Sequence, residues 1–226
     1  MPGITLIKYI FNIIRLLWNF IRKIPNQMKL ILLMHFFASC NILMITVYAS
    51  SWVGVSILKI DPESMILLRR RKIFDLGISW GSVALMFSAL TAFLTEIFIN
   101  NLSRFLSNKR LFIITQTISS ITLLVLYNTD DFYSVFLTLP LCGIAFGTFN
   151  TVPELIADEI EAQISTVTPK GVFKQMLKMT LFFAEVTMFF GIPFLFLLTP
   201  EVNEILASLI IAGVSGLISV ILGVYS

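Results

Sequence analysis

The amino-acid sequence predicts an all-α integral membrane protein with six transmembrane helices. Hydrophobic residues make up 57% of the 226 residues and charged residues only 13%, about half of the charged fraction that is usual in a soluble domain. The charges divide the chain into apolar runs of about 20 residues, long enough to cross the ~30 Å hydrocarbon core of a bilayer as helices. These runs do not alternate between polar and apolar residues, as the strands of a membrane barrel would. Together these observations exclude a soluble globular domain.

The first segment, residues 1–28, is predicted to lie on the membrane surface rather than to cross the bilayer. Its apolar residues are interrupted by Lys8, Arg15 and Arg22, which recur every seven residues and therefore share one face of a helix. A basic face opposite an apolar one that contains Trp18 is typical of an amphipathic helix at the lipid headgroups. The alternatives are a cleaved signal peptide, for which no small-residue cleavage site follows, and a seventh span. Pro25 separates this segment from the first span.

The remaining chain, residues 29–226, contains the six predicted spans. The first includes the charge-free run 30–58, and Glu185 is the only charged residue well inside any of the six. The predicted helices are 30–56, 76–97, 111–128, 132–153, 176–199 and 204–225.

The distribution of basic residues predicts the orientation of the chain. With a cytoplasmic N-terminus, eleven of the sixteen lysines and arginines lie in inner segments, as the positive-inside rule requires. The basic run 69–72, in an outer loop, argues for the opposite orientation. Both termini are therefore predicted to be cytoplasmic, in a plasma membrane or an endomembrane.

Several short motifs, in order along the chain, resemble those of one transporter family. They are VYASSWVG at 47–54 followed by DP at 61–62, GISWG at 77–81, LSNKR at 106–110, VPELIAD at 152–158 and FAE at 183–185. Their order and spacing resemble the seventh to eleventh helices of solute carrier family 45. That family belongs with the sucrose and glycoside–pentoside–hexuronide symporters of the major facilitator superfamily. Pro25 and His35 also resemble a proline and a histidine at the start of the family's seventh helix.

The resemblance implies a fold, a function and a set of partners. The fold would be one half of a major facilitator transporter, with two inverted three-helix units. Spans one and four would lie nearest the central cavity, and spans three and six farthest from it. The function would be symport of a sugar with protons in the lipid bilayer. Because such carriers rock two six-helix halves around a midplane site, this chain would need a second half or a homo-oligomer.

One position differs from the family and leaves a second interpretation open. Ser51 stands where the family has an aspartate in its seventh helix. The alternative function is therefore a non-transporting membrane module that binds or regulates a partner. The sequence contains no Walker loop, metal-ligand cluster or nucleophile triad, so neither an enzyme, a cofactor nor a metal is predicted. It also lacks an aromatic-rich basic groove, so no nucleic-acid partner is predicted.

The candidate residues for a solute or proton site are polar groups within the spans. Glu185 is either a proton site lining the cavity or a neutral acid that bonds to a neighbouring helix; the family has a glutamine there. Trp80 either stacks on a sugar or anchors the helix at the interface, and His35 is predicted to be a packing or interfacial residue. Neutral groups that would pair with sugar hydroxyls, or only bond across helices, are Asn41, Ser50, Ser51, Asn150 and Thr151.

Overall fold

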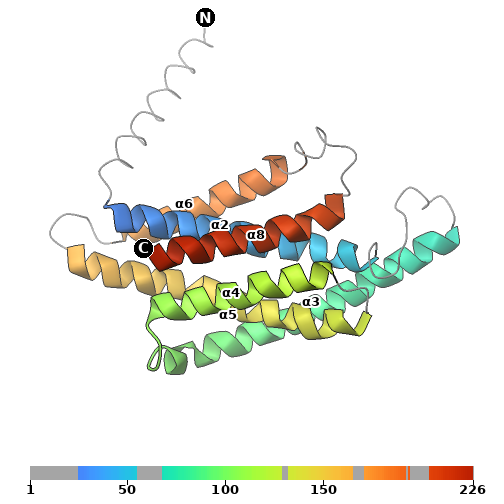
Figure 1. Cartoon of the computed structure of the whole chain (residues 1–226), viewed down its shortest axis with the longest axis horizontal. Coiled ribbons are helices and arrows are strands. Elements are labelled where there is room, and N and C mark those ends of the chain that lie inside the picture. Colours follow the sequence, from blue (N-terminus) through green and yellow to red (C-terminus); the bar gives the residue numbers. More distant parts are fainter. Residues whose placement is uncertain are drawn as a thin grey trace, which may run out of the picture.

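The described part of the chain is a bundle of long helices (Figure 1). The computed structural model describes residues 25–54, 68–128, 132–164, 171–191, 193 and 204–225. These residues form six α-helices and one π-helical turn, which are α2 (Asn26–Trp52), α3 (Leu68–Leu102), α4 (Asn108–Tyr127), α5 (Phe132–Ile164), α6 (Val172–Val186), η3 (Thr187–Gly191) and α8 (Glu204–Tyr225). The all-α prediction is confirmed. The predicted amphipathic helix falls on residues before Pro25 and so lies outside the described residues.

Five of these helices are long and apolar enough to cross a membrane, as an integral membrane protein requires. They are Asn26–Trp52, Lys72–Leu102, Asn108–Tyr127, Tyr133–Ala162 and Ala207–Tyr225. The predicted span 176–199 is not among the five. Its described part consists of α6, which passes directly into η3, and residue 193.

Two helices are longer than the sequence predicted. α3 begins at Leu68, so the basic run 69–72 forms its first turn rather than an outer loop. α5 continues beyond Pro153 to Ile164. At 1.5 Å per residue both helices are roughly 50 Å long, well beyond the thickness of the hydrocarbon core. The charges mark where the apolar stretch ends, but arginine, lysine, glutamate and alanine are good helix formers, so the helices continue past the charges.

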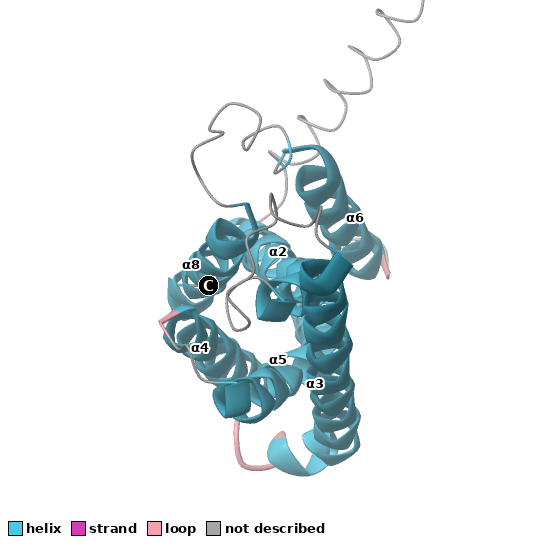
Figure 2. Cartoon of the chain, turned by 90° about the vertical axis from the view of Figure 1, so that its right-hand side faces the viewer, coloured by secondary structure: helices cyan, strands magenta, loops and turns pink. Residues whose placement is uncertain are grey.

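The end-on view shows three pairs of helices (Figure 2). α2 and α5 occupy the middle, α4 and α8 lie on one flank, and α3 and α6 lie on the other. Contacts run in the order α3, α5, α4, α8, α2, α6, and α2 also touches α3 while α5 touches α6. The C-terminal end of α8 lies at the same end of the bundle as the start of α2 (Figure 1).

Small residues allow α3 to approach its neighbours closely. A Cβ atom at Gly81 would lie only 2.6 Å from the Cα of Ser50 in α2. One at Gly143 in α5 would meet the backbone carbonyl of Ser88, and one at Gly147 would meet that of Ala92. Close backbone approach at small residues is the usual packing device of membrane helices.

The interior of the bundle contains a layer of neutral polar groups. Among the described helices α4 contributes the largest share, and its buried polar residues are Thr115, Gln116, Ser119, Ser120 and Thr122. Asn41 of α2 donates to Ser120 Oγ at 3.5 Å, and Ser219 of α8 donates to the carbonyl of Met34 at 2.8 Å. This layer joins α2, α4 and α8. α4 and α8, the third and sixth predicted spans, therefore carry buried polar groups. These spans were predicted to be farthest from the central cavity.

Candidate functional site

A pocket of about 180 Å³ opens where α2, α5 and α6 meet. It is lined by His35, Phe149, Asn150, Pro153, Glu154, Leu177, Lys178 and Leu181. Its polar groups are an imidazole, an amide, a carboxylate and an ammonium, so it combines hydrogen-bond donors with acceptors. It lies toward the end of the bundle where α2 begins, since His35 is in the first half of that helix.

Pro153 shapes the wall of the pocket that α5 provides. It lies inside the helix, and because proline has no N–H it cannot donate to the carbonyl four residues earlier. That carbonyl belongs to Phe149, which also lines the pocket. The backbone carbonyl of Phe149 therefore lacks its normal helical donor.

His35 connects the three helices of the pocket. Its Nδ1 lies 2.7 Å from Thr180 Oγ1 of α6. Its ring stacks on Phe149 of α5, with centroids 4.8 Å apart and an interplanar angle of 11°. The residue is only 6% exposed. The imidazole is thus fixed in position, and its small exposed part lines the pocket.

A charged group lies beside the pocket, between α5 and α6. Lys174 Nζ is 3.0 Å from Asp158 and 4.0 Å from Glu154. The hydrogen bond to the Asp158 carboxylate raises the pKa of Lys174 above its ordinary value, so the lysine stays protonated through neutral pH. All three side chains are more than a third exposed, so solvent screens the pair. Lys178, one turn farther along α6, has no ion-pair partner in the described part of the chain and supplies a free ammonium to the pocket.

Glu161 joins the end of α5 to the start of α6. Its two carboxylate oxygens accept hydrogen bonds from the backbone N–H groups of Gly171 and Phe173, each at 2.9 Å. Gly171 has a φ of 86°, in the left-handed region that glycine adopts without strain. The carboxylate therefore pairs with N–H groups at the positive end of the α6 dipole.

Removing the Glu161 carboxylate is expected to lower the stability of the folded chain. Glu161→Ala leaves two N–H groups at the start of α6 without their acceptor, and the loss of such a cap typically costs about 0.5–2 kcal/mol. Glu161→Gln keeps one acceptor oxygen and should lose less. Thermal unfolding in detergent would rank the three proteins; equal melting temperatures for Glu161→Ala and wild type would contradict this role.

The structure places two of the predicted site residues near the pocket. Asn150 lines it directly. Glu185 lies one helical turn beyond Leu181 and two beyond Lys178, and residues at these spacings share a helix face. Glu185 is half-buried and has no hydrogen bond or ion pair with any described residue. Thr151, next to Asn150, instead donates to Glu96 of α3 at 3.3 Å.

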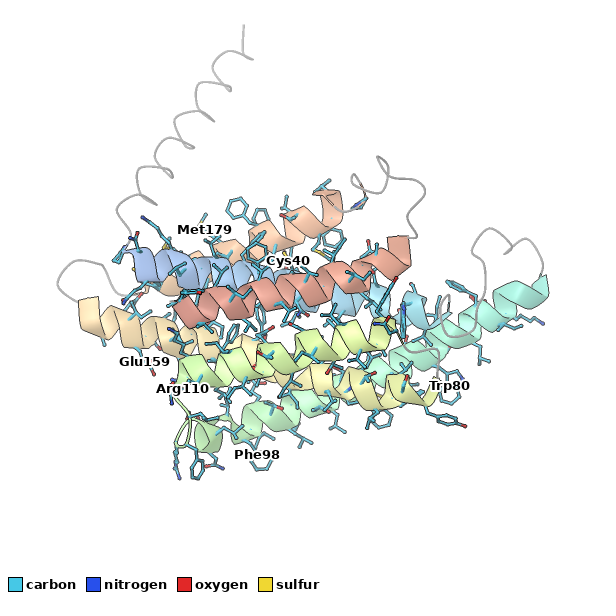
Figure 3. All side chains as sticks on the ribbon, in the orientation of Figure 1. Cys40, Trp80, Phe98, Arg110, Glu159 and Met179 are labelled. Carbon is cyan, nitrogen blue, oxygen red and sulfur yellow. The ribbon has the colours of Figure 1, made fainter. Side chains whose placement is uncertain are left out.

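The other predicted site residues lie elsewhere. Asn41 is fully buried in the polar layer of the bundle, and Ser50 packs against Gly81. Ser51 is half-buried and lies about 24 Å from His35 along the axis of α2. Trp80 is 43% exposed and meets Phe136 edge-on at 5.9 Å. Figure 3 shows it toward the end of the bundle opposite Arg110.

The sequence did not predict most of the pocket. Phe149, Glu154, Leu177 and Lys178 were not proposed as site residues, and His35 was expected only to pack or to lie at an interface. One signal was present: Lys178 and Glu185 are seven residues apart and therefore on one face of α6.

The described residues include no group of three or more His, Cys, Asp or Glu side chains that could hold a metal ion. Comparison of the chain with protein-family models and with curated proteins finds no match. The fold and the pocket therefore define the class of the protein, a helical membrane protein with a mixed polar site between three helices.

Proposed function

We propose that the chain is one half of a carrier of the major facilitator type, which moves a small hydroxylated solute of the sugar class together with protons. The observation that carries the proposal is the arrangement of the helices. Exchanging the first three helices for the last three replaces α2 by α5, α3 by α6 and α4 by α8. The order of contacts, α3–α5–α4–α8–α2–α6, then becomes the same order read backwards.

This exchange is the relation expected of two inverted three-helix units. A unit with an odd number of spans enters and leaves on opposite sides of the membrane, so its repeat is inverted. The side-by-side pair α4 and α8 exchanges with itself, and so does the central pair α2 and α5 (Figure 2). The arrangement therefore supports the six-helix half of such a carrier, with α2 and α5 in its centre.

The position of the pocket supports solute binding. Sites in these carriers lie near the bilayer midplane at the interface between repeats. This pocket lies toward one end of the bundle, but α2 and α5, which the exchange interconverts, are two of the three helices that line it. A sugar hydroxyl both donates and accepts hydrogen bonds. Lys178 can donate to it, Glu154 can accept from it, and the amide of Asn150 can do both.

Coupling to protons is assigned to Glu185. This acid lies about 10 Å beyond Lys178 along α6 and has no partner among the described residues. A second copy of the chain, or another six-helix half, would complete the cavity. A single six-helix half cannot provide alternating access, because that mechanism rocks two halves against each other.

Uptake by the reconstituted chain tests this function. Proteoliposomes that contain the purified chain are expected to accumulate radiolabelled sucrose when the outside is acidic. Glu185→Gln should preserve the fold but remove the stimulation by acid, because a glutamine can donate a hydrogen bond without releasing a proton. Lys72→Met, at the far end of α3 from the pocket, is the control and should transport normally.

Two results would count against the proposal. Acid-stimulated uptake that persists in Glu185→Gln would remove the proton role from this residue. A folded chain that forms defined oligomers but takes up no sugar would favour the non-transporting membrane module.

A further inference from the structure

The tautomer of His35 follows from the hydrogen bonds around it. Thr180 Oγ1 donates its single proton to the carbonyl of Leu177 at 2.7 Å. Because a hydroxyl has one proton to donate, Thr180 Oγ1 can only accept a hydrogen bond from His35 Nδ1, 2.7 Å away. His35 Nδ1 must therefore carry the hydrogen, and in the neutral ring Nε2 carries the lone pair.

Nε2 is the nitrogen that remains available. It has no hydrogen-bond partner in the part of the chain that the structure describes, and the ring lines the pocket. The stack on Phe149 and the bond to Thr180 prevent the ring from turning without the loss of both contacts. A preorganised acceptor of this kind binds a donor without an ordering cost.

We propose that His35 takes part in recognition of the solute: its Nε2 lone pair accepts a hydrogen bond from a solute hydroxyl in the pocket. This inference rests on the proposed function, because it assigns a specificity-determining residue to the same site. It gives the site a neutral acceptor beside the anionic acceptor Glu154 and the cationic donor Lys178. A neutral polyhydroxylated molecule satisfies all three, because each of its hydroxyl groups can both donate and accept a hydrogen bond.

A proton and a solute hydroxyl compete for the same lone pair. Protonation of Nε2 turns the acceptor into a donor, so a protonated His35 should no longer accept a hydrogen bond from the solute. The titratable groups that share the pocket are Glu154 of α5 and Lys178 of α6. Lys174 and Asp158 pair with each other nearby, and Glu185 lies farther along α6.

The single histidine of the chain makes the test direct. His35 is the only one among 226 residues, so ¹⁵N-histidine labelling of the whole chain in detergent gives one imidazole to observe by NMR. We expect the Nδ1–H tautomer at neutral pH. Thr180→Val should shift the tautomer ratio toward Nε2–H by up to about tenfold, the effect of one hydrogen bond. Thr187→Val is the matched control, because Thr187 Oγ1 donates to the backbone carbonyl of Phe183, one turn earlier, at 2.8 Å and has no other hydrogen bond among the described residues.

Addition of sucrose tests the solute contact. We expect sucrose to shift the Nε2 resonance toward that of a hydrogen-bonded acceptor, and glycine betaine, which has no hydroxyl, to leave it unchanged. An Nε2–H tautomer, or a ratio insensitive to Thr180→Val, would overturn the assignment of the ring. The expected tautomer with no response to sucrose would overturn the role in solute binding.

Failure of the proposed function would give a different result. A normal sucrose response at Nε2 in a chain that transports nothing would leave the binding role intact and remove only transport.

Discussion

Gly143→Leu is expected to separate α3 from α5 and to give the largest loss of stability of any substitution considered. A Cβ at this position would meet the backbone carbonyl of Ser88 and lie 3.0 Å from Thr91 Cβ. A backbone atom cannot move aside as a flexible side chain can, so the helices must shift apart. Overpacking of this kind typically costs about 1–3 kcal/mol and occasionally more, and a leucine adds three further carbons. Heating in detergent followed by size-exclusion chromatography would measure the loss.

Gly191→Leu is the matched control for this result. Among the described residues, the atom near its Cβ would be Thr187 Cγ2, at an ordinary 3.6 Å. Because both substitutions replace a helical glycine by leucine, the difference between them reports the contact between α3 and α5. A Gly143→Leu protein as heat-stable as wild type would mean that the two helices do not approach as closely as the structure shows.

The contact between α3 and α5 also shows what the helix exchange preserves. Its counterpart is the contact between α6 and α2, which contains Met28, Phe173 and Leu177 in a small apolar cluster. One contact uses glycines and close backbones, and the other uses large side chains. The two contacts that the exchange relates are therefore built from different kinds of residue.

The positions of the helices could be predicted because charges are excluded from the hydrocarbon core. The run 111–128 was predicted as a span, and α4 is Asn108–Tyr127. The ends of α3 and α5 could not be predicted in this way. Both helices continue through charged residues, the basic run 69–72 in α3 and the acidic stretch after Pro153 in α5. Hydropathy marks where the apolar stretch ends, not where the helix ends.

The pocket was harder to predict, because it depends on which helices touch. Glu154 and Lys178 were treated as markers of the membrane edge, yet they line one site. Asn41 was proposed as a site residue but is enclosed by α2, α4 and α8, where it bonds to Ser120. A neutral polar residue inside a span gives no sign of the direction that it faces until its neighbours are known.

The second large effect is a gain in stability, expected from a substitution in the polar layer around α4. Gln116 is fully buried, and neither its Nε2 nor its Oε1 has a hydrogen-bond partner among the described residues. A buried polar group without a partner costs about 1–3 kcal/mol, and no water is available in the hydrocarbon region to replace the partner. Burial of the Gln116 amide is therefore expected to lower the free energy of unfolding of the chain.

Gln116→Met is therefore expected to stabilise the chain. Methionine has nearly the same length and flexibility but no amide, so it removes both unpartnered atoms and keeps the packing. A gain of about 1–3 kcal/mol should raise the melting temperature in detergent by about 2–4 °C per kcal/mol. Ser120→Ala, one turn along the same face, is the contrasting variant. Ser120 Oγ donates to the backbone carbonyl of Gln116 at 2.7 Å and accepts from Asn41 Nδ2 at 3.5 Å. Its loss leaves Asn41 Nδ2 without this partner and should lower the melting temperature. A lower melting temperature for Gln116→Met would mean instead that the amide binds a group in the interior, and that this layer is a polar site rather than an unsatisfied one.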